Sequence, residues 1–351
     1  MSKNLFKLND GSILPVSEKR FLIPFLTNTS KGTNYFGPPP KKQASNIYFA
    51  SKVLQLHQIL DLFKSINVDL KKKSFLDVGT GNGLIPKALI ATNSIKFAYG
   101  TDLYSPYEHG SANIPLENEK NTKTFFKILS KSIIKSYLNY KSYKNNLRAS
   151  AEREIFQPQK NYLKRPNYKS SLKYKFKKIG AHDLNLLKKK FDVIYCKGIE
   201  HFPDWKKTVK NFKSVSKKNS FVYLRIRPFY SYLGPHRYAT TSIPWGHALM
   251  NEEEYERYVR KFHFSRKDQM LNSYYNSITY PRYTINELIE IFEKNNFILY
   301  GQKIETPPYI SKIFKFKKKI KNFEKLISKK VKNLNNNELF SSSQHLIFKR
   351  I

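Results

Sequence analysis

The chain has 351 residues, of which 40% are hydrophobic and 15% aromatic, so it can bury a large core and is not a disordered protein. No apolar run approaches the roughly 20 residues of a membrane-spanning helix, and the segment FLIPFL is too short for a signal peptide, so we expect a cytoplasmic protein without a transmembrane segment. The net charge of +38 would suit a nucleic-acid or anionic-membrane partner, but the excess is mostly lysine in a chain rich in Asn, Ile, Tyr and Phe, as AT-rich coding produces whatever the partner.

Two regions are predicted along the chain. Residues 1–70 form an N-terminal helical cap, in which FGPPPKK makes an extended bend before a helix around residues 47–63. In residues 71–351, short apolar runs alternate with helical stretches, which is typical of βαβ units and a parallel sheet. Strands are predicted at residues 74–79, 95–104, 172–180, 191–196, 220–227, 297–305 and 344–351, and helices at 84–91, at 204–215 and after Thr284, a suitable N-cap.

Three insertions, at residues 103–172, 228–283 and 307–340, interrupt this alternation. The third holds ten lysines in residues 312–332, with apolar residues recurring every three or four positions from Ile313 to Val331. This pattern predicts a basic amphipathic helix. We favour docking of its apolar stripe on the protein's own core over the alternative, peripheral contact with an anionic membrane through residues 312–332.

Three glycines follow the first predicted strand of residues 71–351, in the stretch DVGTGNG that ends at Gly83. Glycine permits positive φ and lets a ligand approach the backbone closely. The dinucleotide pattern G-x-G-x-x-G does not fit, because Leu84 occupies its last position, and no Gly-Lys-Ser/Thr follows as in a P-loop. The pattern D-x-G-x-G-x-G resembles instead the first motif of class I S-adenosylmethionine-dependent methyltransferases.

The resemblance continues further along the chain. Asp102 ends the second predicted strand, where an acid suits the two ribose hydroxyls of the cofactor. Asp183 follows the third strand, where the family has an acid beside the adenine amino group. The stretch FDVIYCKGIEHFPDW resembles the fourth-strand motif of small-molecule and quinone enzymes of the methyltransferase type 11-like superfamily, with Glu200 and His201 as its acid–histidine pair.

The resemblance implies a Rossmann-like α/β fold, with a seven-stranded, mostly parallel sheet and an antiparallel C-terminal strand, to which the N-terminal cap and the three insertions are added. It also implies S-adenosylmethionine as the cofactor. The expected cofactor-binding residues are Asp77, Gly79, Gly81, Gly83, Asp102, Asp183 and Cys196. Asp77 would serve the ammonium group of the cofactor. Cys196, the single cysteine, excludes an internal disulfide and lacks the preceding proline of cytosine-5 enzymes, so we interpret it as a buried small residue and not as a nucleophile.

The predicted function is methyl transfer to a small-molecule or lipid-like acceptor, because the Glu200-His201 motif is shared with small-molecule enzymes. His201 is the candidate general base, and the alternative is that the pair only holds its loop. The candidate substrate contacts are Lys197, Arg237, Trp245 and His247. We expect residues 228–283 to close over the carboxyl edge of the sheet, above Gly81 and His201; the alternative is that their aromatic side chains pack on one another. No metal site is expected.

Two other functions stay open. An RNA or protein methyltransferase would use the basic surface to attract a polyanion, although nucleic acid is not the favoured partner. A membrane-associated scaffold would keep the fold without turnover, and the intact glycines and Asp102 argue against it.

Overall fold

The computed structural model describes residues 5–16, 52, 55–81, 83–103, 173–235, 239–264, 267–307, 310–332 and 334–351. The predicted insertion at 103–172 therefore lies outside the described residues, apart from its first residue. No helix in the described part of the chain is long and apolar enough to cross a membrane.

A seven-stranded sheet with the strand order β5-β4-β3-β6-β7-β9-β8 forms the larger part of the molecule. Its strands are β3 (Ser74–Val78), β4 (Phe97–Asp102), β5 (Tyr174–Lys178), β6 (Phe191–Lys197), β7 (Ser216–Ile226), β8 (Phe297–Glu305) and β9 (Ser343–Arg350). Neighbouring strands are parallel, except that β9 runs antiparallel to both β7 and β8. The predicted Rossmann-like sheet with an antiparallel C-terminal strand is thus confirmed.

The strand order reverses between β3 and β6. The chain passes from β3 outward to β4 and β5, and then returns to the other side of β3 as β6. Open α/β sheets bind ligands outside the carboxyl ends of their strands at such a reversal. The register pairs Val78 of β3 with Cys196 of β6, so the segments that follow these two strands emerge side by side.

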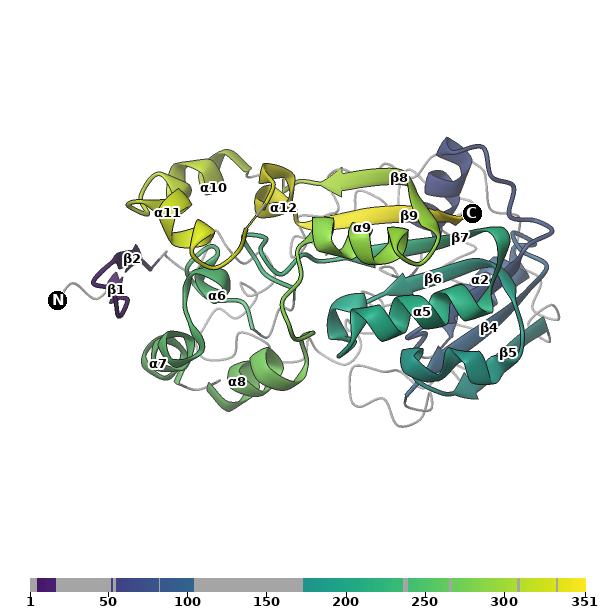
Figure 1. Ribbon diagram of the computed structural model, residues 1–351, viewed down its shortest axis with the longest axis horizontal. Helices are drawn as coiled ribbons and strands as arrows, with labels where there is room; N and C mark the ends of the chain where they lie inside the picture. The colour runs from purple at the N-terminus through teal and green to yellow at the C-terminus, as the bar shows by residue number, and fades with distance from the viewer. Residues whose placement is uncertain are drawn as a thin grey trace, which may run out of the picture.

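Helices cover both faces of this sheet (Figure 1). Residues 55–65, which are helical, and α2 (Leu84–Ala91) share a core with one face, and α5 (Trp205–Val215) and α9 (Ile285–Glu293) share a core with the other. Asp204 caps α5 by accepting a hydrogen bond from the backbone N–H of Lys207. Thr284 caps α9 in a capping box with Glu287, as its position predicted.

A second hydrophobic core, here called the auxiliary core, lies beyond one end of the sheet (Figure 1). It joins the hairpin of β1 (Leu5–Lys7) and β2 (Ile13–Pro15) to the helices α6 (Gly246–Leu249), α7 (Glu252–Phe262), α8 (Lys267–Asn276), α10 (Ile310–Lys317), α11 (Phe323–Ser328) and α12 (Asn336–Phe340). Phe6 packs edge-to-face on Tyr258 of α7, with ring centroids 5.3 Å apart. The N-terminal hairpin and the second and third insertions therefore share one core, although they are distant in sequence.

The lysine-rich segment 312–332 is not the single helix that its periodicity predicts. Asn322 adopts a left-handed φ of 57° and separates α10 from α11. The apolar stripe is buried in the auxiliary core, as Ile313 (0% exposed) and Phe323 (2%) illustrate. Docking of the stripe on the protein's own core is confirmed, because the auxiliary core covers it; peripheral membrane contact through the exposed lysines of residues 312–332 stays a prediction.

Candidate active site

The glycine-rich turn after β3 contains three glycines with a left-handed backbone. Gly79, Gly81 and Gly83 have φ values of 73°, 59° and 71°. The backbone N–H groups of Gly79 and Thr80 donate to the carbonyl of Thr101 on β4, at 2.9 and 3.0 Å. The turn is thus held against the second strand, and residues with a Cβ would be strained at all three glycines.

The three glycines accommodate different neighbours. A Cβ on Gly83 would lie 2.4 Å from the hydroxyl of Tyr174, the first residue of β5. A Cβ on Gly79 would lie 3.7 Å from the ring of Phe202, so the glycine-rich turn is in contact with the loop that follows β6. A Cβ on Gly81 would meet no atom within 4 Å. The backbone of Gly81 therefore faces open space, as a ligand-binding turn requires. The sequence pattern carried no signal for Tyr174, because its partner glycines are distant in sequence.

Two carboxylates flank this turn. Oδ2 of Asp102, at the end of β4, accepts a hydrogen bond from the Gly81 N–H at 2.8 Å. Asp77, at 4% exposure, accepts from the Thr80 hydroxyl at 2.7 Å. Burial raises the pKa of Asp77 to about 6, against the opposing effects of Thr80 and of the Lys52 charge. The structure therefore brings together two of the predicted cofactor residues at the turn, and Asp77 is poised to gain from a cation.

Two further predicted cofactor residues have different environments. Asp183 is exposed in the 3₁₀ helix Ala181–Leu187 that follows β5, at the same edge of the sheet. Cys196 is fully buried in the core on the α5 and α9 face, and burial raises the pKa of its thiol well above the usual range. The expectation of a small buried residue holds. Its side chain, however, packs in the core and is not available to a cofactor.

The loop after β6 holds the end of the second insertion. This loop contains the 3₁₀ helix η4 (Ile199–His201). Thr279 of the insertion forms hydrogen bonds with backbone carbonyls of the loop. The Thr279 hydroxyl lies 2.9 Å from the carbonyl oxygen of Glu200 and 2.6 Å from that of Phe202, and its backbone N–H donates to the carbonyl of Glu200 at 2.7 Å. Trp205 donates its indole N–H to the same hydroxyl at 2.9 Å. The insertion is therefore anchored at the carboxyl edge of the sheet, beside His201.

His201 is exposed and is hydrogen-bonded through Nδ1 to the backbone carbonyl of Ser277. A carbonyl can only accept, so Nδ1 carries the proton. In the neutral ring, Nε2 is then the basic nitrogen. Nδ1 of His201 therefore contacts the insertion, which fits the interpretation that His201 holds its loop. Nε2 is the atom that the general-base interpretation requires.

Two predicted substrate contacts are corrected by the structure. Trp245 is fully buried, donates its indole N–H to the carbonyl of Leu339 at 3.0 Å, and packs edge-to-face on Phe323. His247 is 2% exposed, and its Nε2 lies 2.6 Å from the carbonyl oxygen of Phe229. Burial lowers the pKa of His247 to about 4. Both side chains stabilise the auxiliary core, because the aromatic residues of the insertion pack on one another.

The other two predicted contacts differ from these. Lys197 is exposed at the carboxyl end of β6, where an acceptor contact would require it. Arg237 lies outside the described residues. In the described ranges, no group of three or more His, Cys, Asp or Glu side chains is arranged to hold a metal ion.

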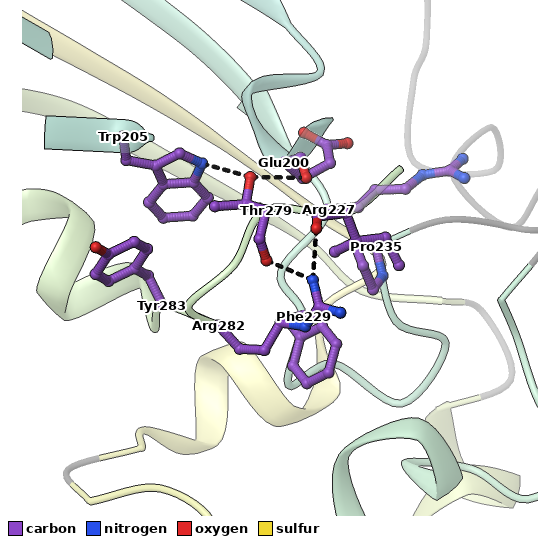
Figure 2. A pocket seen from close by; sticks show the side chains of 9 residues that line it. Glu200, Trp205, Arg227, Phe229, Pro235, Thr279, Arg282 and Tyr283 are labelled. Atoms are coloured by element: carbon purple, nitrogen blue, oxygen red, sulfur yellow. Dashed lines mark hydrogen bonds between the residues drawn. The ribbon is translucent and has the colours of Figure 1, made fainter. Parts of the chain in front are cut away.

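A pocket lies beyond the carboxyl ends of β6 and β7 (Figure 2). Its lining residues are Glu200, Trp205, Arg227, Phe229, Pro235, Ile278, Thr279, Arg282 and Tyr283. Most of these come from the second insertion and were not singled out individually, because only the folded chain brings them to the loop after β6.

Comparisons with known proteins identify the family of the chain. The methyltransferase-domain family matches residues 49–299. A comparison with curated proteins finds no match. Solved structures that align with the chain include a protein from Galdieria sulphuraria assigned as a sarcosine dimethylglycine methyltransferase, which is 9% identical over 84% of this chain and 85% of that chain, with a TM-score of 0.38.

Two other alignments are of the same kind. The YcgJ protein of Bacillus subtilis is 14% identical over 84% of this chain and 98% of that chain, with a TM-score of 0.35. Phosphoethanolamine N-methyltransferase 2 of Haemonchus contortus, in complex with phosphomonomethylethanolamine and S-adenosylhomocysteine, is 14% identical over 84% of this chain and 52% of that chain, with a TM-score of 0.38. The assignment rests on the domain match and the strand order, not on these alignments. The domain match spans most of the chain. The chain therefore belongs to the methyltransferase-domain family and is an S-adenosylmethionine-dependent methyltransferase of the class I fold.

Proposed function

We propose that this methyltransferase acts on a small-molecule or lipid-like acceptor, which binds in the pocket beyond β6 and β7. The observation that carries the proposal is the position of Phe202 beside Gly79, where a Cβ would lie 3.7 Å from its ring, because it brings the glycine-rich turn next to the loop that lines this pocket. The pocket lies beside the anchored insertion, and its aromatic, carboxylate and guanidinium side chains suit the polar end of a small-molecule or lipid-like acceptor.

The residues around the glycine-rich turn fit S-adenosylmethionine. Gly81 lies beside the Asp102 carboxylate, which accepts from the Gly81 N–H and would accept from the ribose hydroxyls of the cofactor. Asp77 would serve the cofactor's ammonium group, and the exposed Asp183 the adenine amino group. The cofactor, when bound, supplies a methyl group on a sulfonium, which is an excellent leaving group. The chain is left with binding, orientation and proton transfer.

His201 is the proposed general base for an acceptor that carries a proton at neutral pH. Its Nδ1 is committed to the Ser277 carbonyl, which orients the ring and makes Nε2 the atom that accepts the proton. Lys197 lies at the end of the adjoining strand as a contact for the acceptor.

Cofactor binding is tested by isothermal titration of the full chain with S-adenosylmethionine. Asp102→Asn keeps a side-chain oxygen for the Gly81 N–H but removes the negative charge and one of the two acceptor oxygens. We expect about 10- to 100-fold weaker binding, since hydrogen bonds to charged groups contribute about 1.5–3 kcal/mol. Asp10→Asn, on the exposed N-terminal hairpin, is the matched control and should bind like the wild type. Equal affinity for Asp102→Asn and the wild type would reject the proposed role of Asp102.

A second candidate acceptor is an RNA or an acidic protein, and one observation favours it. With the apolar stripe of residues 312–332 buried, nine lysines of this segment are exposed: Lys312, Lys315, Lys318, Lys319, Lys321, Lys325, Lys329, Lys330 and Lys332. Binding of an RNA oligonucleotide would then weaken steeply between 50 and 200 mM salt. RNA affinity that is unchanged over this range excludes this candidate.

A further inference from the structure

The pocket in Figure 2 is lined by one buried carboxylate, Glu200, of which one oxygen has no hydrogen-bond partner among the described residues, although the charges of His201 and Arg227 lie near it. Glu200 is 8% exposed, and no group in the described part of the chain donates a hydrogen bond to its Oε2. A buried carboxylate oxygen without a donor is costly, so native proteins rarely retain one without a functional reason. Glu200 is thus the group in this pocket that calls for a ligand.

The positive charge of Arg282 in the same pocket is already satisfied. Its guanidinium donates to the backbone carbonyls of Ile278 at 2.6 Å and Tyr274 at 2.7 Å. It also lies over the rings of Phe229 and Tyr274, 5.1 and 5.0 Å from their centroids. These contacts make Arg282 a structural clamp of the insertion, so it is not available as an anion-binding group.

Aromatic rings form the walls near Glu200. Trp205 and Tyr283 are stacked with centroids 5.1 Å apart and an interplanar angle of 24°, and Phe229 lines the opposite part of the pocket. The indole N–H of Trp205 is used by Thr279 and by the Ile199 carbonyl, which fixes the ring. Rigid aromatic faces beside a carboxylate are the surroundings that favour an organic cation.

We propose that this pocket is the acceptor subsite for a protonated amine, with the Glu200 carboxylate as its counter-ion and the rings of Trp205, Phe229 and Tyr283 as its walls. The inference rests on the proposed function and deepens it, because it names nitrogen as the methylated atom. An alcohol would donate to the same oxygen but would bring no charge to pair with the carboxylate.

The chemistry balances with the groups present. The ammonium gives one proton to the Glu200 carboxylate and becomes a neutral amine with a free lone pair. That lone pair forms the new N–C bond to the transferred methyl group while the S–C bond breaks, and its electron pair stays on sulfur. The products are a methylated ammonium and a neutral thioether. Burial raises the pKa of Glu200, which equips it to take the proton, while His201 and Arg227 oppose that rise.

Binding of a matched pair of probes tests the subsite on the full chain saturated with S-adenosylhomocysteine. 2-Phenylethylamine and 2-phenylethanol share a skeleton and differ only in the amine. We expect the amine to bind at least tenfold more tightly in isothermal titration, and Glu200→Gln to remove this preference. Equal binding of the two probes, or no binding of the amine, overturns the inference.

Two glutamine variants separate function from folding. Glu200→Gln removes a buried charge whose Oε2 has no donor among the described residues, so its resistance to urea should equal or exceed that of the wild type. Glu254→Gln changes an equally buried carboxylate that caps α7 and accepts from the Asn9 N–H, so it should lose stability but keep the preference for the amine probe. If Glu200→Gln loses stability instead, Glu200 is a structural residue and the inference fails.

Product analysis distinguishes this inference from the proposed function. The full chain is incubated with methyl-labelled S-adenosylmethionine and the small-molecule fraction of a cell extract, and the products are separated by cation exchange at pH 7. Label in a retained, cationic product that falls at least tenfold in Glu200→Gln supports the amine subsite. Label only in unretained products leaves the methyltransferase function intact and overturns the subsite. Absence of cofactor binding in the wild type overturns both.

Discussion

At the scale of single residues, the glycine-rich turn shows two separate uses of the same residue type. All three glycines have a left-handed backbone, but only Gly81 leaves open space above it. Gly83 is required because the hydroxyl of Tyr174 occupies the position of its missing side chain. One glycine thus admits a ligand, and another admits a side chain from the edge strand β5.

The alanine variants of these two glycines should therefore differ. Gly81→Ala is expected to cost about 1–2 kcal/mol of unfolding free energy, for the left-handed φ alone, and to weaken cofactor binding. Gly83→Ala should cost at least ~1 kcal/mol more, because Tyr174 must also move. Urea unfolding of the two variants and the wild type, without cofactor, measures the difference. Equal losses would show that Tyr174 yields freely and that backbone strain is the whole effect.

At the scale of elements, Thr279 is central to the attachment of the second insertion to the sheet, to which the His201–Ser277 hydrogen bond and the Trp205–Tyr283 stack also contribute. Thr279 meets the backbone carbonyls of the loop after β6 and the indole of Trp205. The pocket walls contributed by residues 278–283 depend on this attachment. The loop that contains Glu200 and His201 therefore lines the pocket, and it also holds in place residues 278–283, which line the pocket too.

We expect Thr279→Val to lower the unfolding free energy by about 1–3 kcal/mol, because buried partners lose a hydrogen bond. Acceptor turnover should fall while S-adenosylmethionine affinity stays within twofold, since the glycine-rich turn is untouched. Urea unfolding, titration and turnover with methyl-labelled cofactor are the measurements.

Thr208→Val is the matched control for this variant. Thr208 of α5 is also fully buried, but its hydroxyl has no partner among the described residues. Its replacement by valine should be neutral or slightly stabilising. If the two variants behave alike, the hydrogen bonds of Thr279 contribute nothing to the attachment.

At the scale of the whole molecule, the sheet and the auxiliary core have different roles. The sheet with its covering helices positions the predicted cofactor residues, and the auxiliary core holds the insertion that lines the pocket. The N-terminal hairpin completes the auxiliary core, where Arg257 of α7 donates to the Lys7 carbonyl at 2.9 Å and Asn9 donates its backbone N–H to Glu254. The first residues of the chain therefore stabilise a region far from them in sequence.

Phe6→Ala should cost about 3–5 kcal/mol, as for other buried phenylalanines, and the loss should be local. Hydrogen exchange should show lost protection in α7, with β3, β6 and β7 unchanged. Leu5→Ala is the control from the same strand, because Leu5 is 40% exposed and its truncation should cost less than about 0.5 kcal/mol. Equal loss of protection in the sheet would show that the two cores unfold as one unit.

The sequence by itself determined the sheet and the cofactor turn. Alternating apolar runs report strands and helices, and the stretch from Asp77 to Gly83 is local, so its backbone demands are visible in the residues themselves. Asp102 follows from the same logic, because it ends the strand next to the turn. The capping of α9 by Thr284 is equally local, since its partner Glu287 is three residues away.

Only the tertiary structure decided what the insertions do. Trp245 and His247 are residue types that occur both in binding surfaces and in hydrophobic cores, and the neighbouring sequence does not distinguish the two. Both are buried because Trp245 packs on Phe323 and His247 packs on Phe229 in the folded chain. Thr279 and Arg282 carry no motif at all, yet they build the pocket. Glu200 was visible in its motif, but its unsatisfied oxygen was not, because hydrogen-bond satisfaction is a property of three-dimensional neighbours and not of sequence spacing.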